Sequence, residues 1–147
     1  MRRIFNRIFG RNSSKQPLQK KLPIIRLADA EAVTQYRKIL EEMVVILKRN
    51  GYPTEEAMLQ EALNALRTDT STFVELVTGG GIWGGSGSVS DCNFRGLSAA
   101  SPSQAKADQK RKYELLSSLA SRLVRDGMTN PRIESLGQAY SIWSKEM

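Results

Sequence analysis

The 147-residue sequence contains no histidine and a single cysteine, Cys92. Without an imidazole the chain can form neither a Ser-His-Asp triad nor a Cys-His pair, and zinc sites that use histidine are excluded. Cys92 lies between Asp91 and Asn93, so no basic neighbour in the sequence lowers the pKa of its thiol. From these residue types we expect no catalytic residues, no metal ligands and no cofactor.

Carboxylates are the remaining candidates for acid–base or metal chemistry, and the chain contains 15 acidic residues. Glu41 and Glu42 form one adjacent pair, and Glu55 and Glu56 form another. Neighbouring residues on a helix point about 100° apart, so neither pair is arranged for shared chemistry. The calcium-loop pattern D-x-[DN]-x-[DN]-G is absent from the sequence. We interpret both acid pairs as solvated helix faces.

A glycine-rich segment places six of the 11 glycines between Gly79 and Gly87. Residues 79–84 match the pattern G-x-G-x-x-G, but a dinucleotide-binding fingerprint needs a strand before it and a helix directly after it. Here a helix is expected before the pattern. A phosphate-binding P-loop also fails, because Gly85 stands where its lysine belongs. The segment therefore does not predict nucleotide binding.

The same segment differs from a plain flexible linker because it carries large apolar residues: Ile82, Trp83, Val89 and Phe94. A buried tryptophan covers about 200 Å², and flanking glycines let the backbone approach its ring closely. We expect an ordered loop that Trp83 pins across the fold. In the alternative interpretation, this loop or the groove beside it binds a partner.

Apolar spacing and capping residues predict helices before this segment. The first main helix lies between Asp29, its N-cap, and a stop at Asn50 and Gly51. A second main helix is expected to start at Thr54. A short helix is then expected to begin with a capping box formed by Thr72 and Glu75.

Two further main helices are predicted after the segment. Ser101 and Pro102 are typical of a helix start, and that helix runs to Asp126. Asn130 caps a final helix, whose apolar face carries Ile133, Leu136, Tyr140 and Trp143. The expected fold is an all-α bundle of four main helices plus one short helix, with the Gly-rich ordered loop between the helical halves.

Positive charge is concentrated at the N-terminus. Residues 1–26 carry eight basic residues and no acid, whereas the rest of the chain carries 14 basic and 15 acidic residues. The basic residues of this arm include Arg2, Arg3, Arg7, Arg11, Lys20 and Lys21. We divide the chain into a basic arm at 1–28 and a single helical domain at 29–147. Nucleic-acid binding by the near-neutral domain is not expected.

Within the arm, Ile4, Phe5, Ile8 and Phe9 predict a short amphipathic helix at 2–10, followed by a Pro-containing linker. Three interpretations stay open: residues 1–11 lie on an anionic membrane, the arm docks on a protein surface, or the terminus is frayed. No apolar run approaches the ~18 residues that span a bilayer. We expect a cytoplasmic protein that is peripheral to the membrane if the first interpretation holds.

Residues 83–91, Trp-Gly-Gly-Ser-Gly-Ser-Val-Ser-Asp, resemble the W-G-G-x-G-S-hydrophobic-x-D turn of an uncharacterised family of small helical bacterial proteins. The resemblance covers roughly residues 32–95. Some members of that family look like immunity proteins encoded near polymorphic toxins, so the resemblance implies binding rather than catalysis. The residues it singles out, as partner-binding or loop-shaping, are Trp83, Gly84, Gly85, Gly87, Ser88 and Asp91.

Together these features predict a non-enzymatic bacterial protein that binds another protein, most plausibly an immunity-type protein that neutralises a cognate toxin by occlusion. The alternative is a peripheral membrane or nucleic-acid adaptor that binds through the basic arm, residues 1–26.

Overall fold

The computed structural model describes residues 29–96 and 99–147, and within these ranges every regular element is a helix. The four long helices are α2 (Ala30–Arg49), α3 (Pro53–Thr68), α6 (Pro102–Arg125) and α7 (Pro131–Glu146). Between α3 and α6 lie the short helix α4 (Thr70–Thr78) and the single turn α5 (Gly80–Trp83). The predicted all-α fold is confirmed. The predicted arm helix at 2–10 lies outside the described residues.

Three of the predicted N-caps form the expected hydrogen bonds. The Asp29 carboxylate accepts from the Glu31 N–H at 3.0 Å. The Ser101 hydroxyl accepts from the Gln104 N–H at 3.2 Å, and the Asn130 side chain accepts from the Ile133 N–H at 3.1 Å. Each cap satisfies a backbone donor that has no partner inside its helix.

The predicted caps of the second main helix and the short helix are wrong. Helix α3 begins at Pro53 rather than after Thr54, because the fixed φ of proline suits a first helical position. Helix α4 begins at Thr70, and its cap is Asp69 rather than Thr72. The Asp69 carboxylate accepts from the Thr72 N–H at 3.2 Å and from the Thr72 hydroxyl at 2.7 Å. Aspartate is the stronger cap, so the break between α3 and α4 shrinks to one residue.

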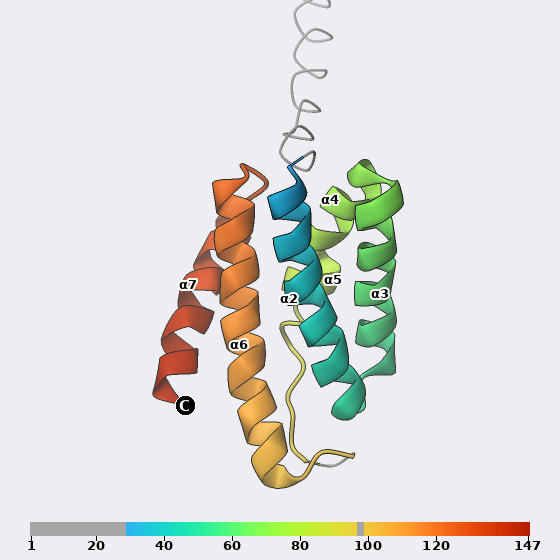
Figure 1. Cartoon of the computed structure of the whole chain (residues 1–147). Coiled ribbons are helices and arrows are strands. Elements are labelled where there is room, and N and C mark those ends of the chain that lie inside the picture. The colour runs from blue at the N-terminus through green and yellow to red at the C-terminus, as the bar shows by residue number, and fades with distance from the viewer. Residues whose placement is uncertain (1–28, 97–98) are drawn as a thin grey trace, which may run out of the picture.

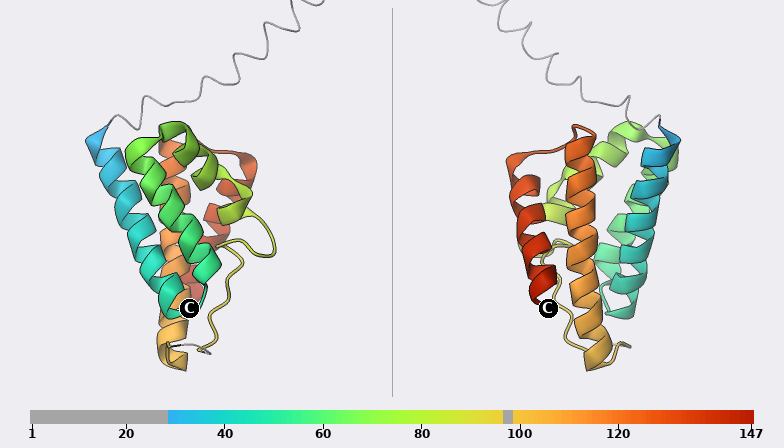
Figure 2. Two further views of the ribbon diagram at one scale, coloured as in Figure 1. Left: turned by 90° about the vertical axis from the view of Figure 1, so that its right-hand side faces the viewer. Right: turned by 60° about the vertical axis from the view of Figure 1, so that its left-hand side comes forward.

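The long helices lie roughly along one direction (Figure 1). Helix α2 is in the middle of this view, with α3 on one side and α6 on the other, and α7 packs on the outer side of α6. Helices α4 and α5 lie behind α2, and the chain from α5 to α6 descends to the lower end of the bundle (Figures 1 and 2).

One cluster of buried apolar residues connects the helices. Tyr36 of α2 and Phe73 of α4 meet edge to face, with ring centroids 5.4 Å apart. The Tyr36 hydroxyl donates to the Asp126 carboxylate at 2.7 Å, and Arg122 donates to the same carboxylate at 2.9 Å. Among the described helices, none has both the length and the apolar character needed to cross a membrane.

Candidate functional site

Trp83 lies in the core, where only 1% of its surface is exposed. Its indole N–H donates to the Val77 carbonyl at 2.7 Å, so both the ring and its polar atom are satisfied internally. The Arg132 side chain, from the start of α7, donates to the Trp83 carbonyl. Of the two roles expected for Trp83, shaping the loop fits this position, whereas the ring offers no surface to a partner.

The predicted glycines fall into two groups. A Cβ on Gly84 would lie 2.2 Å from the Gly80 carbonyl oxygen, so close backbone packing requires glycine at this position. Gly87 has a φ of +86°, which disfavours residues with a Cβ. Gly85 is exposed and has free space around its Cα, so no contact requires it.

Residues 88–91, Ser-Val-Ser-Asp, form a turn that is stabilised by the first serine. The buried Ser88 hydroxyl donates to the Gly84 carbonyl at 2.7 Å and accepts from the Asp91 N–H at 3.3 Å. Its contact to the Ser90 hydroxyl is 2.9 Å. Asp91 is exposed at the outer side of this turn. Ser88 thus stabilises the turn by an ST-type contact, with no Asx contact from Asp91.

This turn is part of a strap, defined here as residues 84–94. The N–H groups of Val89 and Ser90 donate to the carbonyls of Gly81 and Ile82, at 2.9 and 3.0 Å. These bonds satisfy carbonyls that the single turn α5 leaves open. These two bonds therefore fix the middle of the strap to α5.

A buried lysine on α6, which the sequence reasoning missed, holds the rest of the strap. Lys112 is 1% exposed, and its ammonium donates to the carbonyls of Val89, Ser90 and Cys92. The rings of Phe94 and Tyr113 lie 5.2 and 5.4 Å from its Nζ atom. No carboxylate within residues 29–96 and 99–147 forms an ion pair with Lys112. Strap carbonyls and aromatic faces therefore solvate this charge.

The cost of this arrangement appears in the pKa of Lys112. Burial disfavours the ammonium and lowers the pKa to about 8, although Cys92 and Asp91 oppose the shift. Burial also raises the pKa of the Cys92 thiol to about 11, which makes it a poor nucleophile at neutral pH. A signal for Lys112 was present in the sequence, because it lies four residues from Leu116 on the apolar face of its helix.

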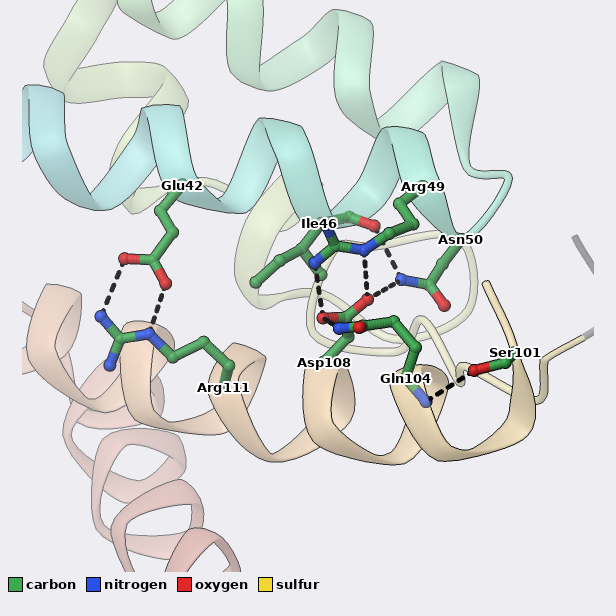
Figure 3. A network of polar contacts seen from close by, with 8 residues as sticks. All are labelled: Glu42, Ile46, Arg49, Asn50, Ser101, Gln104, Asp108 and Arg111. Carbon is green, nitrogen blue, oxygen red and sulfur yellow. Dashed lines mark hydrogen bonds and ion pairs between the residues drawn. The ribbon is translucent and has the colours of Figure 1, made fainter. Parts of the chain in front are cut away.

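One helical turn before Lys112, the buried Asp108 has a different environment. Arg49 at the end of α2 donates to both of its carboxylate oxygens, at 2.7 and 2.8 Å (Figure 3). The side chains of Asn50 and Gln104 each donate to it at 2.8 Å. Burial raises the pKa of Asp108, but these hydrogen bonds outweigh it and hold the pKa below its usual range. The network ties the lower end of α2 to α6.

The acid pairs, which we interpreted as solvated helix faces, are partly solvated: Glu41 is exposed, and Glu42, Glu55 and Glu56 are half-buried. Glu42 pairs with Arg111 of α6, with a second contact at 2.8 Å (Figure 3). Glu55 is half-buried, and one of its carboxylate oxygens is buried without a hydrogen-bond partner in the described part of the chain. No group of three or more acids or thiols among the described residues is placed to hold a metal ion.

The exposed aromatic residue of the described domain is on α7. Trp143 is 45% exposed, and its ring meets Tyr113 and Tyr140 edge to face, with centroids 5.7 and 5.5 Å apart. The rings of Tyr113 and Tyr140 stack at 5.3 Å with an interplanar angle of 8°. Ile142 and Met147 are exposed nearby in the sequence.

The basic arm residues that the sequence analysis singled out lie outside the described residues: Arg2, Arg3, Arg7, Arg11, Lys20 and Lys21.

Comparison of the chain with protein-family models, with curated proteins and with solved structures finds no match in any of the three.

Proposed function

We propose that this chain is a non-enzymatic protein-binding module. The observation that carries the proposal is Trp143, a large ring that is exposed yet held in one orientation by Tyr113 and Tyr140. An aromatic side chain ordered in advance loses little conformational entropy when a partner covers it. Tryptophan is also among the residues that contribute most to protein–protein binding energy.

The specific form we propose is immunity-type neutralisation of a bacterial toxin by occlusion. The support for this form is the resemblance of residues 83–91 to the W-G-G-x-G-S-hydrophobic-x-D turn. The charge of the domain argues against a nuclease as the toxin, because an inhibitor of a basic nucleic-acid site is expected to be acidic. The domain has 14 basic and 15 acidic residues and is close to neutral.

Co-expression with each growth-inhibiting product of the genes that neighbour the gene of this chain tests the proposal. We expect the full chain to restore growth and to form a complex that survives gel filtration. Trp143→Ala should weaken that complex at least tenfold, whereas Trp143→Phe should retain most of the affinity. The matched control is Val124→Ala, which truncates another exposed apolar residue, on α6. Absence of both growth rescue and a complex would overturn the proposal.

A second candidate function is peripheral membrane binding through the arm. Its support is the sequence of residues 1–11, where Ile4, Phe5, Ile8 and Phe9 accompany four arginines and no acid. A basic residue near an anionic bilayer contributes about 1 kcal/mol, and this attraction is screened by salt. The full chain should sediment with vesicles containing phosphatidylserine but not with phosphatidylcholine alone. Replacing the four arginines by glutamine should abolish the sedimentation, and an unchanged result would exclude this function.

A further inference from the structure

A groove of about 610 Å³ is lined by residues of α2 and α3. Helix α3 lies on the opposite side of the bundle from α7 (Figure 1). The apolar residues of the groove are Val44, Val45 and Leu63. Val45 is 54% exposed, Leu63 is half-buried, and Val44 is almost fully covered. Single exposed valines are ordinary, but here three aliphatic side chains line one hollow.

The polar lining of the groove is dominated by hydrogen-bond donors. Arg37 and Arg67 both line it, and within residues 29–96 and 99–147 neither forms an ion pair. The α3 wall adds the amides of Gln60 and Asn64 and has no acid, so Glu41 on α2 is the one carboxylate in the lining. Two positive charges against one negative charge favour an acidic occupant.

The dimensions of the groove suit a helix. Arg37 and Val45 are eight residues apart on α2, which corresponds to about 12 Å, or two helical turns. An amphipathic helix fills such a groove with apolar residues at i, i+4 and i+7. The chain's own arm is a poor occupant, because its eight basic residues would face two arginines.

We propose that the α2/α3 groove is a docking site for an acidic amphipathic helix of a partner protein. Its apolar stripe packs on Val45 and Leu63, with Val44 at the floor of the groove, and its flanking carboxylates pair with Arg37 and Arg67. This goes beyond the proposed function, because it adds a second recognition surface on a different pair of helices. Failure of toxin neutralisation would therefore not contradict the groove proposal. Failure of the groove to bind an acidic helix would likewise not contradict toxin neutralisation.

The test uses the full chain with methyl-labelled valine and leucine. The probe is an 18-residue peptide with leucine at positions i, i+4, i+7 and i+11 and with glutamate or alanine elsewhere. A control peptide carries lysine in place of every glutamate. We expect the acidic peptide to shift the Val45 and Leu63 methyl signals and to bind at least tenfold more tightly than the control. Its affinity should fall several-fold between 50 and 300 mM salt, because exposed charges are screened.

Substitutions then locate the binding. Val45→Asp and Arg67→Gln should each lower the affinity at least fivefold. The matched controls are Val124→Asp and Arg125→Gln on α6, and both should leave the affinity unchanged. The proposal is overturned if no methyl shifts are seen, if the lysine peptide binds as well, or if the α6 controls weaken binding equally. Methyl shifts that depend on protein concentration without peptide would point to a second copy of the chain and would also overturn it.

Discussion

The two tryptophans of this chain occupy opposite environments. Trp83 is 1% exposed, and its indole N–H donates to the Val77 carbonyl. Trp143 is 45% exposed, and the neighbours that orient it are the rings of Tyr113 and Tyr140. The first ring is enclosed in the core, whereas the second is half-exposed at the bundle surface.

The difference follows from the elements around each ring. Trp83 ends a glycine-rich turn in which Gly84 lies against the Gly80 carbonyl without room for a Cβ, and both α4 and α7 contact Trp83 through hydrogen bonds. Trp143 lies near the end of the last helix, which packs mainly on α6. A tryptophan is thus buried when several elements pack around it. A position on the apolar face of a helix is not enough to bury it.

Truncating the two rings should give the largest contrast. Trp83→Ala should lower the free energy of unfolding by about 3–5 kcal/mol, because it opens a large cavity in the core. Trp143→Ala should lower it by only about 1 kcal/mol, since the ring is half-exposed. Urea denaturation of both variants measures the difference. Equal losses would contradict the division into a core tryptophan and a surface tryptophan.

A smaller contrast is expected within the glycine-rich turn. Gly84→Ala should cost about 1–3 kcal/mol, because its Cβ would lie 2.2 Å from the Gly80 carbonyl oxygen. Gly85→Ala should change stability by less than about 0.5 kcal/mol, because its Cβ would meet no atom within 4 Å. Thermal melting distinguishes the two. A destabilising Gly85→Ala variant would show that the motif glycine has a role that the contacts do not explain.

Because Lys112 holds the strap, the free energy of unfolding should also depend on pH in a characteristic way. Burial lowers the pKa of Lys112 from 10.5 to about 8, so between these values the unfolded chain binds more protons than the folded chain. The free energy of unfolding should therefore rise with pH in this window, by about 1 kcal/mol from pH 8 to pH 9.

The control for this pH dependence is Lys112→Met, in which the rise should disappear. The measurement stops at pH 9, because the raised pKa of Cys92 makes the thiol contribution to stability fall as pH approaches the ordinary thiol value of 9 and fall further beyond it. A wild-type curve that is flat or falling between pH 8 and pH 9 would contradict the buried position of the Lys112 ammonium.

The smallest expected effect is on the quenching of tryptophan fluorescence by iodide. In Trp143→Phe the remaining fluorescence comes from Trp83, and iodide should scarcely quench it because the ring is buried. The wild-type protein should show an additional quenchable component from Trp143. Stern–Volmer plots of both proteins check this, and strong quenching of the variant would place Trp83 at the surface.

The sequence predicted helices and caps where the decisive contacts are local. Asp29, Ser101 and Asn130 each bond a backbone N–H within three residues, so spacing alone reveals them. Thr72 was predicted as a cap because its own spacing also fits, but Asp69 competes for the same turn. Two cap candidates three residues apart compete for one helix start, and single-residue patterns do not rank them.

The contacts that hold the strap and the lower end of the bundle could not be predicted in this way. Arg49 and Asp108 are 59 positions apart, and Lys112 reaches carbonyls 20 to 23 positions away. These partners become neighbours only when the helices pack. Trp143 was correctly placed on an apolar helix face, but its exposure depends on whether another element covers that face.

The burial of Lys112 by the strap has a consequence for the chemistry of its amine. A lowered pKa gives this amine more of its neutral, nucleophilic form at pH 8 than an ordinary lysine has, while the strap keeps acylating reagents away from it. The folded protein therefore covers an amine that would be more reactive than an ordinary lysine near pH 8 if it were exposed. The rate at which a water-soluble ester acetylates Lys112 therefore reports how often the strap exposes this amine to solvent.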